Sequence, residues 1–267
     1  KFKMKKYLVI GNPVEHSLSP KLHNFWIKQN NIDAIYDKKL IMLEEITDVI
    51  NDLKRNIISG INVTIPFKIE IIPFLDELTL LAKETGSVNT VYKKNNKIIG
   101  DNTDVGGFEC AIKDINFNLG GKKAFIIGAG GVAPSIISAL KKGGIKEIFI
   151  TNRTNEKLEI LKTKYPDLNI VSWGNTVSSD LIINATSLGL KKGDEIKLDY
   201  NKFGSNKLFY DVIYNPEKTN FLINAKKNNN KIENGKKMFV YQAQLAFEKW
   251  HNIRPKVDNN IIEFLND

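Results

Sequence analysis

The feature that most constrains the fold of this 267-residue chain is a glycine-rich segment, residues 128–133, which reads GAGGVA. It follows an apolar run at 124–127 and opens a helical pattern over 132–142. A G-x-G-x-x-A segment between a strand and a helix is typical of loops that bind dinucleotide phosphates. The first glycine makes the tight turn, the second lets the backbone approach the pyrophosphate, and the helix N-terminus faces the negative charge. The residues expected to hold the cofactor here are Gly128, Ala129, Gly130, Gly131 and Val132.

The residues after the next predicted strand, 147–151, indicate which dinucleotide is bound. An NAD-binding unit usually ends this strand with Asp or Glu, which bonds the ribose 2′-hydroxyl. Here Asn152, Arg153 and Thr154 follow the strand, with Lys157 one turn further on. A planar guanidinium suits a phosphate, so the segment predicts NADP. The alternative is an ordinary surface arginine ahead of a helix.

Strand-like and helix-like stretches alternate along the whole chain, which predicts an α/β fold of two domains with a cleft between them. The predicted strands are residues 6–10, 34–41, 57–64, a hairpin of 87–93 with 97–101, and then 123–127, 147–151, 170–173, 181–184, 207–212 and 231–233. The predicted helices are residues 21–30, 43–54, 67–75, 78–85, 132–142, 156–164 and 238–250, with a last helical stretch after Pro255.

Composition narrows the function classes. The formal net charge is +9, but only three residues are arginine, and the lysines are scattered rather than interleaved with aromatic residues. Nucleic-acid binding is therefore the weakest hypothesis, although a positive field could attract a small anion. A single cysteine, Cys110, and no Cys/His cluster predict neither a disulfide nor a metal site. No apolar run is long enough for a membrane span or a signal peptide, so we expect a cytoplasmic protein without a membrane partner.

Four polar clusters in the first 104 residues lie at or just beyond predicted strand ends. They supply hydroxyls, amides, an amine and carboxylates, a set that suits a polyhydroxylated small acid. Each cluster alone could be ordinary cap or turn chemistry. The clusters are residues 17–20, 62–68, 87–90 and 100–104.

In this order ahead of the glycine loop, and with further motifs at 152–154, 184–189, 210–214 and 241–243, the clusters resemble the shikimate dehydrogenase family over nearly the whole chain. The resemblance implies NADPH-dependent, reversible reduction of 3-dehydroshikimate to shikimate, in chorismate and aromatic amino-acid biosynthesis. It implies an N-terminal substrate-binding catalytic domain with a mostly parallel sheet, residues 1–104 plus 238–267. It also implies a C-terminal Rossmann-type NADP domain, residues 105–237.

The resemblance also implies residue roles. Lys68 and Asp104 would bracket the reacting oxygen, since an ammonium can stabilise a developing alkoxide and deliver a proton. Which of the two is the formal acid stays open. A helix is predicted after Pro66, and the positive end of its dipole would disfavour a lysine at position 68. The presence of Lys68 there therefore favours a functional role for this residue. The remaining residues are Ser17 and Ser19 for the substrate carboxylate, Thr64, Asn89 and Gln242 for the ring hydroxyls and carboxylate, Tyr214 near the same pocket, and Val212 and Gly235 near the nicotinamide.

Two departures from the family pattern are visible. Lys237 stands where a second glycine usually precedes the methionine, and Pro134 and Ser135 stand where small or basic residues are frequent. Other hypotheses stay open: a relative that also oxidises quinate or uses NAD, and a catalytically silent, cofactor-binding regulatory protein of the same fold. The expected partner is the small-molecule substrate, and a homodimer is an open option.

Overall fold

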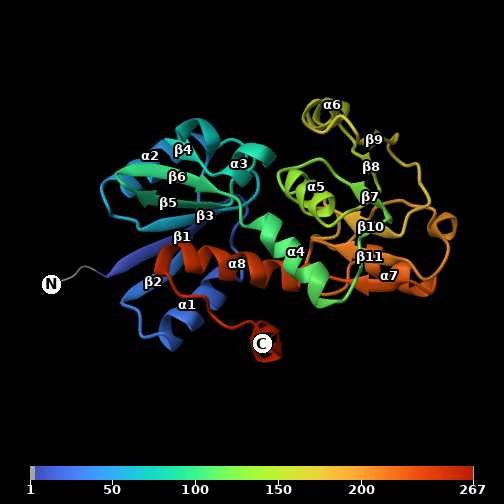
Figure 1. The fold of residues 1–267 in the computed structure, drawn as a ribbon. Coiled ribbons are helices and arrows are strands. Elements are labelled where there is room, and N and C mark those ends of the chain that lie inside the picture. Colours follow the sequence, from blue (N-terminus) through green and yellow to red (C-terminus); the bar gives the residue numbers. More distant parts are fainter. Residues whose placement is uncertain (1–3, 267) are drawn as a thin grey trace. The chain divides into compact units, whose positions relative to one another are not determined.

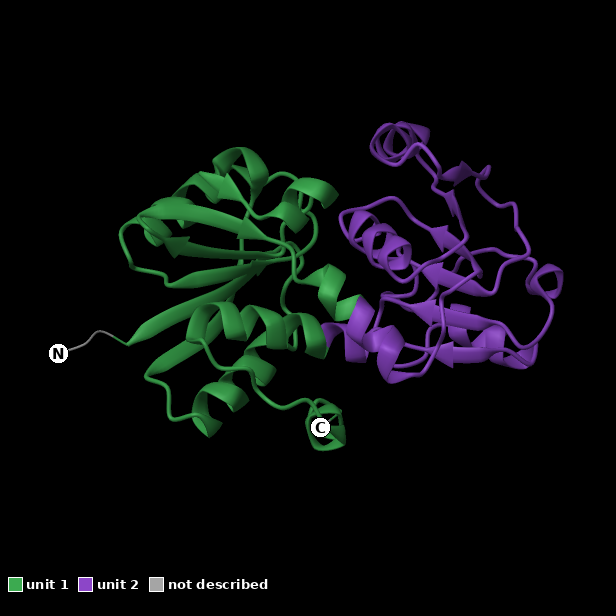
Figure 2. Cartoon of the chain, in the orientation of Figure 1, with its two compact units in different colours: residues 1–108, 240–267 green, residues 109–239 purple. Residues whose placement is uncertain are grey.

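The computed structural model describes residues 4–266 and divides the chain into two compact units (Figures 1 and 2). Unit 1 comprises Lys1–Phe108 and Val240–Asp267, and unit 2 comprises Glu109–Phe239. The divisions fall inside two helices, α4 (Asp104–Asp114) and α8 (Lys236–His251). Both units are α/β, which confirms the predicted fold class.

Unit 1 is built on a six-stranded sheet in the order β2-β1-β3-β5-β6-β4. β1 pairs in parallel with β2 and β3, whereas β5 is antiparallel to β3 and β6. The strands are β1 (Lys5–Gly11), β2 (Ala34–Leu40), β3 (Gly60–Val63), β4 (Glu77–Leu78), β5 (Thr90–Lys94) and β6 (Lys97–Asp101). The helices that lie wholly in unit 1 are α1 (Ser19–Gln29), α2 (Ile46–Lys54), α3 (Leu80–Thr85) and α9 (Asn259–Phe264).

The predicted hairpin is present as β5 and β6. Lys94 pairs with Lys97 across a two-residue turn, and Asn95 and Asn96 have φ values of 50° and 61°. Asparagine tolerates this left-handed backbone better than most residues, so the turn could be read from the sequence.

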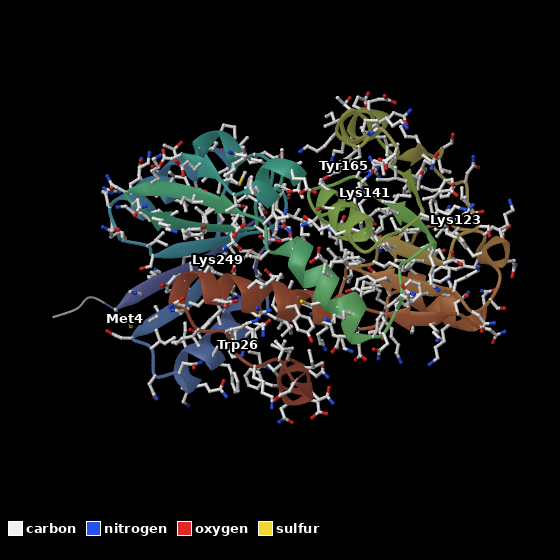
Figure 3. All side chains as sticks on the ribbon, in the orientation of Figure 1. Met4, Trp26, Lys123, Lys141, Tyr165 and Lys249 are labelled. Carbon is white, nitrogen blue, oxygen red and sulfur yellow. The ribbon has the colours of Figure 1, made fainter. Side chains whose placement is uncertain are left out.

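Aromatic side chains from α1, α8 and the sheet form one part of the unit 1 core; Trp26 on α1 is labelled in Figure 3. The His23 ring stacks on Tyr36 with centroids 4.2 Å apart, and Trp250 packs against Tyr7 at 4.9 Å. A Cβ on Gly60 would lie 2.4 Å from Nε1 of Trp250. The missing side chain therefore makes room for the indole.

Lowering the pH from 7 to 5 is expected to destabilise unit 1. Burial lowers the pKa of His23 to about 3 and that of His251 to about 4, so only the unfolded chain takes up these protons below about pH 6.5. For the fully buried His23, the free energy of unfolding is expected to fall by about 2 kcal/mol between pH 7 and pH 5. Hydrogen exchange of α1 and α8 amides at the two pH values measures it. His23→Phe should flatten the dependence, and the exposed His16→Gln should not; equal protection of these helices at both pH values would contradict it.

Several predicted elements of unit 1 are wrong or shortened. Residues 67–75 form turns and a short 3₁₀ helix at Ile72–Phe74 instead of an α-helix, because Pro73 has no amide hydrogen to donate. Lys68 is thus not at a helix N-terminus, and the dipole argument for its function falls. The predicted strand 57–64 shortens to β3. No helix was predicted at α4.

Unit 2 is built on a six-stranded sheet in the order β12-β11-β10-β7-β8-β9, and all its pairs are parallel. The strands are β7 (Lys123–Ile127), β8 (Glu147–Thr151), β9 (Asn169–Ile170), β10 (Leu181–Asn184), β11 (Leu208–Asp211) and β12 (Lys231–Glu233). The helices are α5 (Ala133–Lys142), α6 (Asn155–Lys164) and α7 (Asn220–Lys227). The predicted strand 170–173 shrinks to β9, and α7 was not predicted.

Candidate active site

A buried ion pair joins two predicted site residues of unit 1. Nζ of Lys68 lies 2.6 Å from Oδ2 of Asp104, and their side chains are 14% and 6% exposed. Lys68 follows the turn after β3, where its carbonyl accepts a hydrogen bond from the Val88 amide at 2.8 Å. Asp104 is the first residue of α4, a position that favours a carboxylate. An ammonium held this way can face a ligand without being free to move.

Asn89, which immediately precedes β5, fixes the other carboxylate oxygen. Its Nδ2 lies within hydrogen-bond distance of three acceptors that share its two protons, Oγ1 of Thr103 at 2.8 Å, Oδ1 of Asp104 at 3.1 Å and Oε1 of Gln242 at 3.2 Å. Its Oδ1 accepts from the amide of Thr103 at 2.7 Å. Asn89, Gln242 and the ion pair thus belong to one hydrogen-bonded network.

Ser17, Ser19 and Thr64 lie at the same edge of the sheet. The loop after β1 carries Ser17, whose Oγ accepts from the Ser19 amide at 3.2 Å at the start of α1. Thr64 follows β3, and a Cβ on Gly11 would lie 2.4 Å from its methyl group. Since β1, β3 and β6 run in the same direction, their carboxyl ends bring these residues and Asp104 to one edge.

Tyr214 belongs to unit 2, whereas the other predicted substrate-binding residues belong to unit 1. It follows β11, and its ring packs on Phe239 with centroids 4.6 Å apart.

The glycine loop of unit 2 has the geometry expected of a phosphate-binding loop. Gly128 has a φ of 112°, and a Cβ there would lie 2.8 Å from the Ala185 carbonyl. A Cβ on Gly130 would meet nothing within 4 Å, so the backbone is open to an approaching group. Ala133 is fully buried at the start of α5, and Pro134 is accommodated in the first turn. Gly131 and Val132 complete the loop, which fits a bound pyrophosphate.

The segment after β8 lies beside this loop. Oδ1 of Asn152 accepts from the Ala129 amide at 3.1 Å, and its Nδ2 donates to the Thr154 carbonyl at 2.9 Å. Asn152 therefore ties the two segments together. Arg153, Thr154 and Lys157 are exposed, and no side-chain capping bond engages the Thr154 hydroxyl. The segment that Asn152 ties to the loop thus carries two exposed cations, Arg153 and Lys157, of the kind that an extra phosphate would require.

Val212 and Gly235 are in contact. A Cβ on Gly235 would lie 2.0 Å from the Val212 carbonyl oxygen, which explains why glycine is needed there. Lys237, the departure from the family pattern, lies in the first turn of α8, and its Nζ pairs with Oδ2 of Asp114 at 2.7 Å. The helix accommodates this lysine, and its side chain is engaged by α4.

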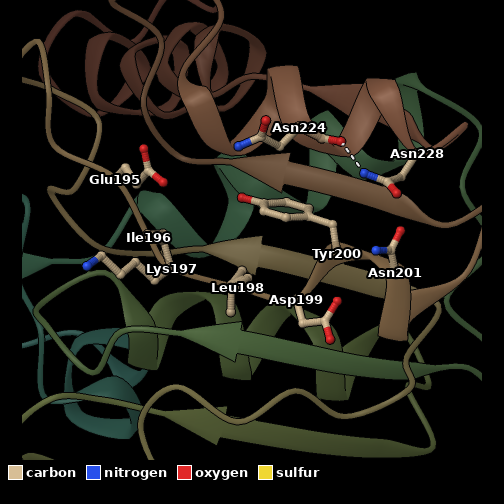
Figure 4. Close-up of a pocket in the computed structure, with 9 residues that line it drawn as sticks. All are labelled: Glu195, Ile196, Lys197, Leu198, Asp199, Tyr200, Asn201, Asn224 and Asn228. Carbon is tan, nitrogen blue, oxygen red and sulfur yellow. Dashed lines mark hydrogen bonds between the residues drawn. The ribbon is translucent and has the colours of Figure 1, made fainter.

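Thr103 and Asn62 also belong to the unit 1 network, and neither was assigned a role from the sequence. Both lie in the polar clusters recognised there, but only the fold brings them next to Asn89. A separate hollow of about 640 Å³ in unit 2 is lined by residues 195–201, by Asn224 of α7 and by Asn228, which directly follows α7 (Figure 4). None of the predicted site residues lines it.

Within residues 4–266, no group of His, Cys, Asp and Glu side chains could hold a metal ion. In the same range, no helix is both long and apolar enough to cross a bilayer.

Comparisons with known proteins agree over the whole chain. A family model described as the shikimate dehydrogenase substrate binding domain matches residues 9–91, and one described as shikimate / quinate 5-dehydrogenase matches residues 109–188. A protein of Pelagibacter ubique (strain HTCC1062) named Shikimate dehydrogenase (NADP(+)) is 54% identical over 261 residues, covering 98% of each chain.

Solved structures are similar along their full length. Shikimate dehydrogenase from Aquifex aeolicus has a TM-score of 0.89 at 36% identity, covering 100% of this chain and 98% of that one. Shikimate 5-dehydrogenase from Thermus thermophilus, in complex with NADP(H) and shikimate, has a TM-score of 0.90 at 30% identity, covering 98% and 99%. The chain therefore belongs to the shikimate dehydrogenase family.

Proposed function

We propose that this chain catalyses the NADPH-dependent, reversible reduction of 3-dehydroshikimate to shikimate, a step of chorismate and aromatic amino-acid biosynthesis, with Lys68 and Asp104 as its catalytic residues. The observation that carries the assignment is their buried 2.6 Å ion pair, set in a network of polar side chains. The relatives named as NADP-dependent shikimate dehydrogenases support it.

The chemistry follows from the residue types. When bound, NADPH supplies the hydride that reduces the substrate ketone. The ketone oxygen gains negative charge in that step, and the Lys68 ammonium stabilises the charge by a hydrogen bond. Asp104 holds the ammonium in place and accepts a hydrogen bond from a substrate hydroxyl. The proton that completes the alcohol comes from this coupled pair.

The other predicted residues bind and orient the ligands. Asn89, Gln242 and Thr64 supply polar atoms for the ring hydroxyls and carboxylate, and Tyr214 is a further substrate-binding residue. The cofactor is held by residues 128–132, by Asn152, Arg153, Thr154 and Lys157, and by Val212 and Gly235 at the nicotinamide. The open backbone at Gly130 and the exposed cations support this assignment.

Ser17→Ala is expected to raise the KM for shikimate more than about tenfold and to leave NADP affinity unchanged. The Ser17 oxygen already accepts the Ser19 amide, so its hydroxyl proton remains for the substrate carboxylate. Losing such a bond to a charged group costs roughly 1.5–3 kcal/mol. Steady-state kinetics measures it, with Ser59→Ala as a control in the same unit. A raised KM for NADP instead of shikimate would contradict this role.

Initial rates with shikimate and quinate, each with NADP and NAD, test the proposed function. We expect the highest kcat/KM with shikimate and NADP. Comparable rates with quinate or with NAD would favour the alternative of a quinate/shikimate dehydrogenase with relaxed specificity.

We further propose a cytoplasmic location. A single cysteine cannot form a disulfide within the chain, and disulfides are rare in the reducing cytosol. A homodimer is also a proposal, and sedimentation of the purified chain tests it.

A further inference from the structure

We propose that Tyr36 is a positioning residue for the catalytic pair, acting through a directional series of hydrogen bonds that passes through Asn62 and Asn89. Tyr36 lies on β2 and is 2% exposed, so it touches neither ligand itself. The proposal rests on the proposed function of Lys68 and Asp104.

The first link is fixed by the backbone. Nδ2 of Asn62 donates to the Asn89 carbonyl at 3.1 Å, and its Oδ1 accepts from the Tyr36 hydroxyl at 2.7 Å. If the Asn62 amide were reversed, its oxygen would face the Asn89 carbonyl, and two acceptors would oppose each other. Tyr36 is therefore the donor, and Asn62 has one favoured orientation.

The second link passes through Thr90. The same Nδ2 of Asn62 donates to Oγ1 of Thr90 at 3.1 Å. The Thr90 proton is then left for one of two acceptors, Oδ1 of Asn89 at 3.2 Å or Oγ1 of Thr103 at 3.3 Å. Both acceptors belong to the network around the catalytic pair.

The last link reaches the carboxylate. Because its Oδ1 accepts from the Thr103 amide and lies within hydrogen-bond distance of the Thr90 hydroxyl, Asn89 must point Nδ2 toward Oδ1 of Asp104. Oδ2 of Asp104 then faces Lys68. Because the side chains from Tyr36 to Asp104 along this route are buried, loss of one donor leaves an unsatisfied acceptor instead of a water contact.

Tyr36 is itself held on three sides. Asn24 of α1 accepts from the Tyr36 amide at 2.9 Å and donates to its carbonyl at 2.7 Å. The ring stacks on His23 with planes 3° apart. A phenol fixed at backbone and ring can hold its hydroxyl at one place, which a positioning group requires.

Tyr36→Phe tests the proposal, with Tyr7→Phe as the matched control. Tyr7 is the register partner of Tyr36 on β1 and is equally buried, and both rings lie near Trp250. Each variant removes one phenolic oxygen from the same layer of the core. We expect Tyr36→Phe to lower kcat about three- to tenfold, the worth of one neutral hydrogen bond, with an unchanged KM for NADP. Tyr7→Phe should have the same kcat as the unmutated protein.

A second variant, Thr90→Val, interrupts the series at its middle and should lower kcat in the same way. Thermal unfolding of all variants is measured in parallel. The proposal would be overturned if Tyr36→Phe had the same kcat as the unmutated protein, or if kcat fell equally in both tyrosine variants. Lack of turnover in the unmutated protein would instead count against the proposed function, so the two failures are distinguishable.

Discussion

Lys68→Ala is expected to lower kcat by about 10²-fold or more, the scale for losing one preorganised donor to a developing oxyanion. The KM for shikimate should change much less, because the interaction strengthens mainly in the transition state. The geometry supports a large effect on kcat. The 2.6 Å ion pair with Asp104 already holds the ammonium in place, so little entropy is lost in positioning it during the reaction. Steady-state kinetics on the folded protein measures it.

The matched control is Lys97→Ala. Lys97 also pairs with a carboxylate in unit 1, that of Glu77, but this pair is exposed. Exposed pairs contribute little, so kcat should not change. An unchanged kcat in Lys68→Ala would contradict the catalytic assignment.

Arg153→Ala is expected to remove most of the preference for NADP over NAD. A charge-assisted pair with the 2′-phosphate contributes about 1.5–3 kcal/mol, so the unmutated chain should prefer NADP roughly 10- to 150-fold. The variant should raise the KM for NADP and leave that for NAD nearly unchanged. Arg153 is exposed beside the glycine loop, and Asn152 ties its segment to Ala129.

Arg55→Ala serves as the control, because Arg55 is engaged by Asp52 in unit 1 at 2.9 Å. Its kcat/KM ratio for the two cofactors should match the unmutated chain. Equal kcat/KM for NADP and NAD in the unmutated protein would show that the Arg153 segment does not face the ribose.

Elements that depend on local sequence were predicted well. The Asn95-Asn96 turn, the glycine loop and the strands at its sides each follow from a few adjacent residues. Residues 67–75 were not, because apolar spacing alone suggested a helix. Phe67 and Ile71 are buried, but they reach the core from turns. Pro73 is compatible with these turns and would disrupt the interior of an α-helix.

Helix α4 was not predicted, because the feature that favours its glycines is a tertiary packing contact. It contains Gly106 and Gly107, which disfavour a helix when judged by propensity. A Cβ on Gly106 would lie 2.6 Å from the side chain of Leu245 on α8, so the glycine permits close packing of the two helices. Such a requirement is visible only once both helices are placed.

Motifs in the sequence predict the candidate site residues, but they do not predict how these residues are arranged relative to one another. Lys68 and Asp104 are 36 residues apart in sequence, and Asn89 and Gln242 are 153 apart. The direction of each amide depends on neighbours such as Thr103 and Asn62 that only the folded sheet supplies.

Formation of NADPH from shikimate and NADP⁺ by the purified chain tests the proposed activity most directly. We expect one 3-dehydroshikimate for each NADPH formed, with turnover lowered about 10²-fold or more in Lys68→Ala and retained in Lys97→Ala. A protein that binds both ligands and yet forms no NADPH would contradict the assignment and would leave a catalytically silent, cofactor-binding member of the family.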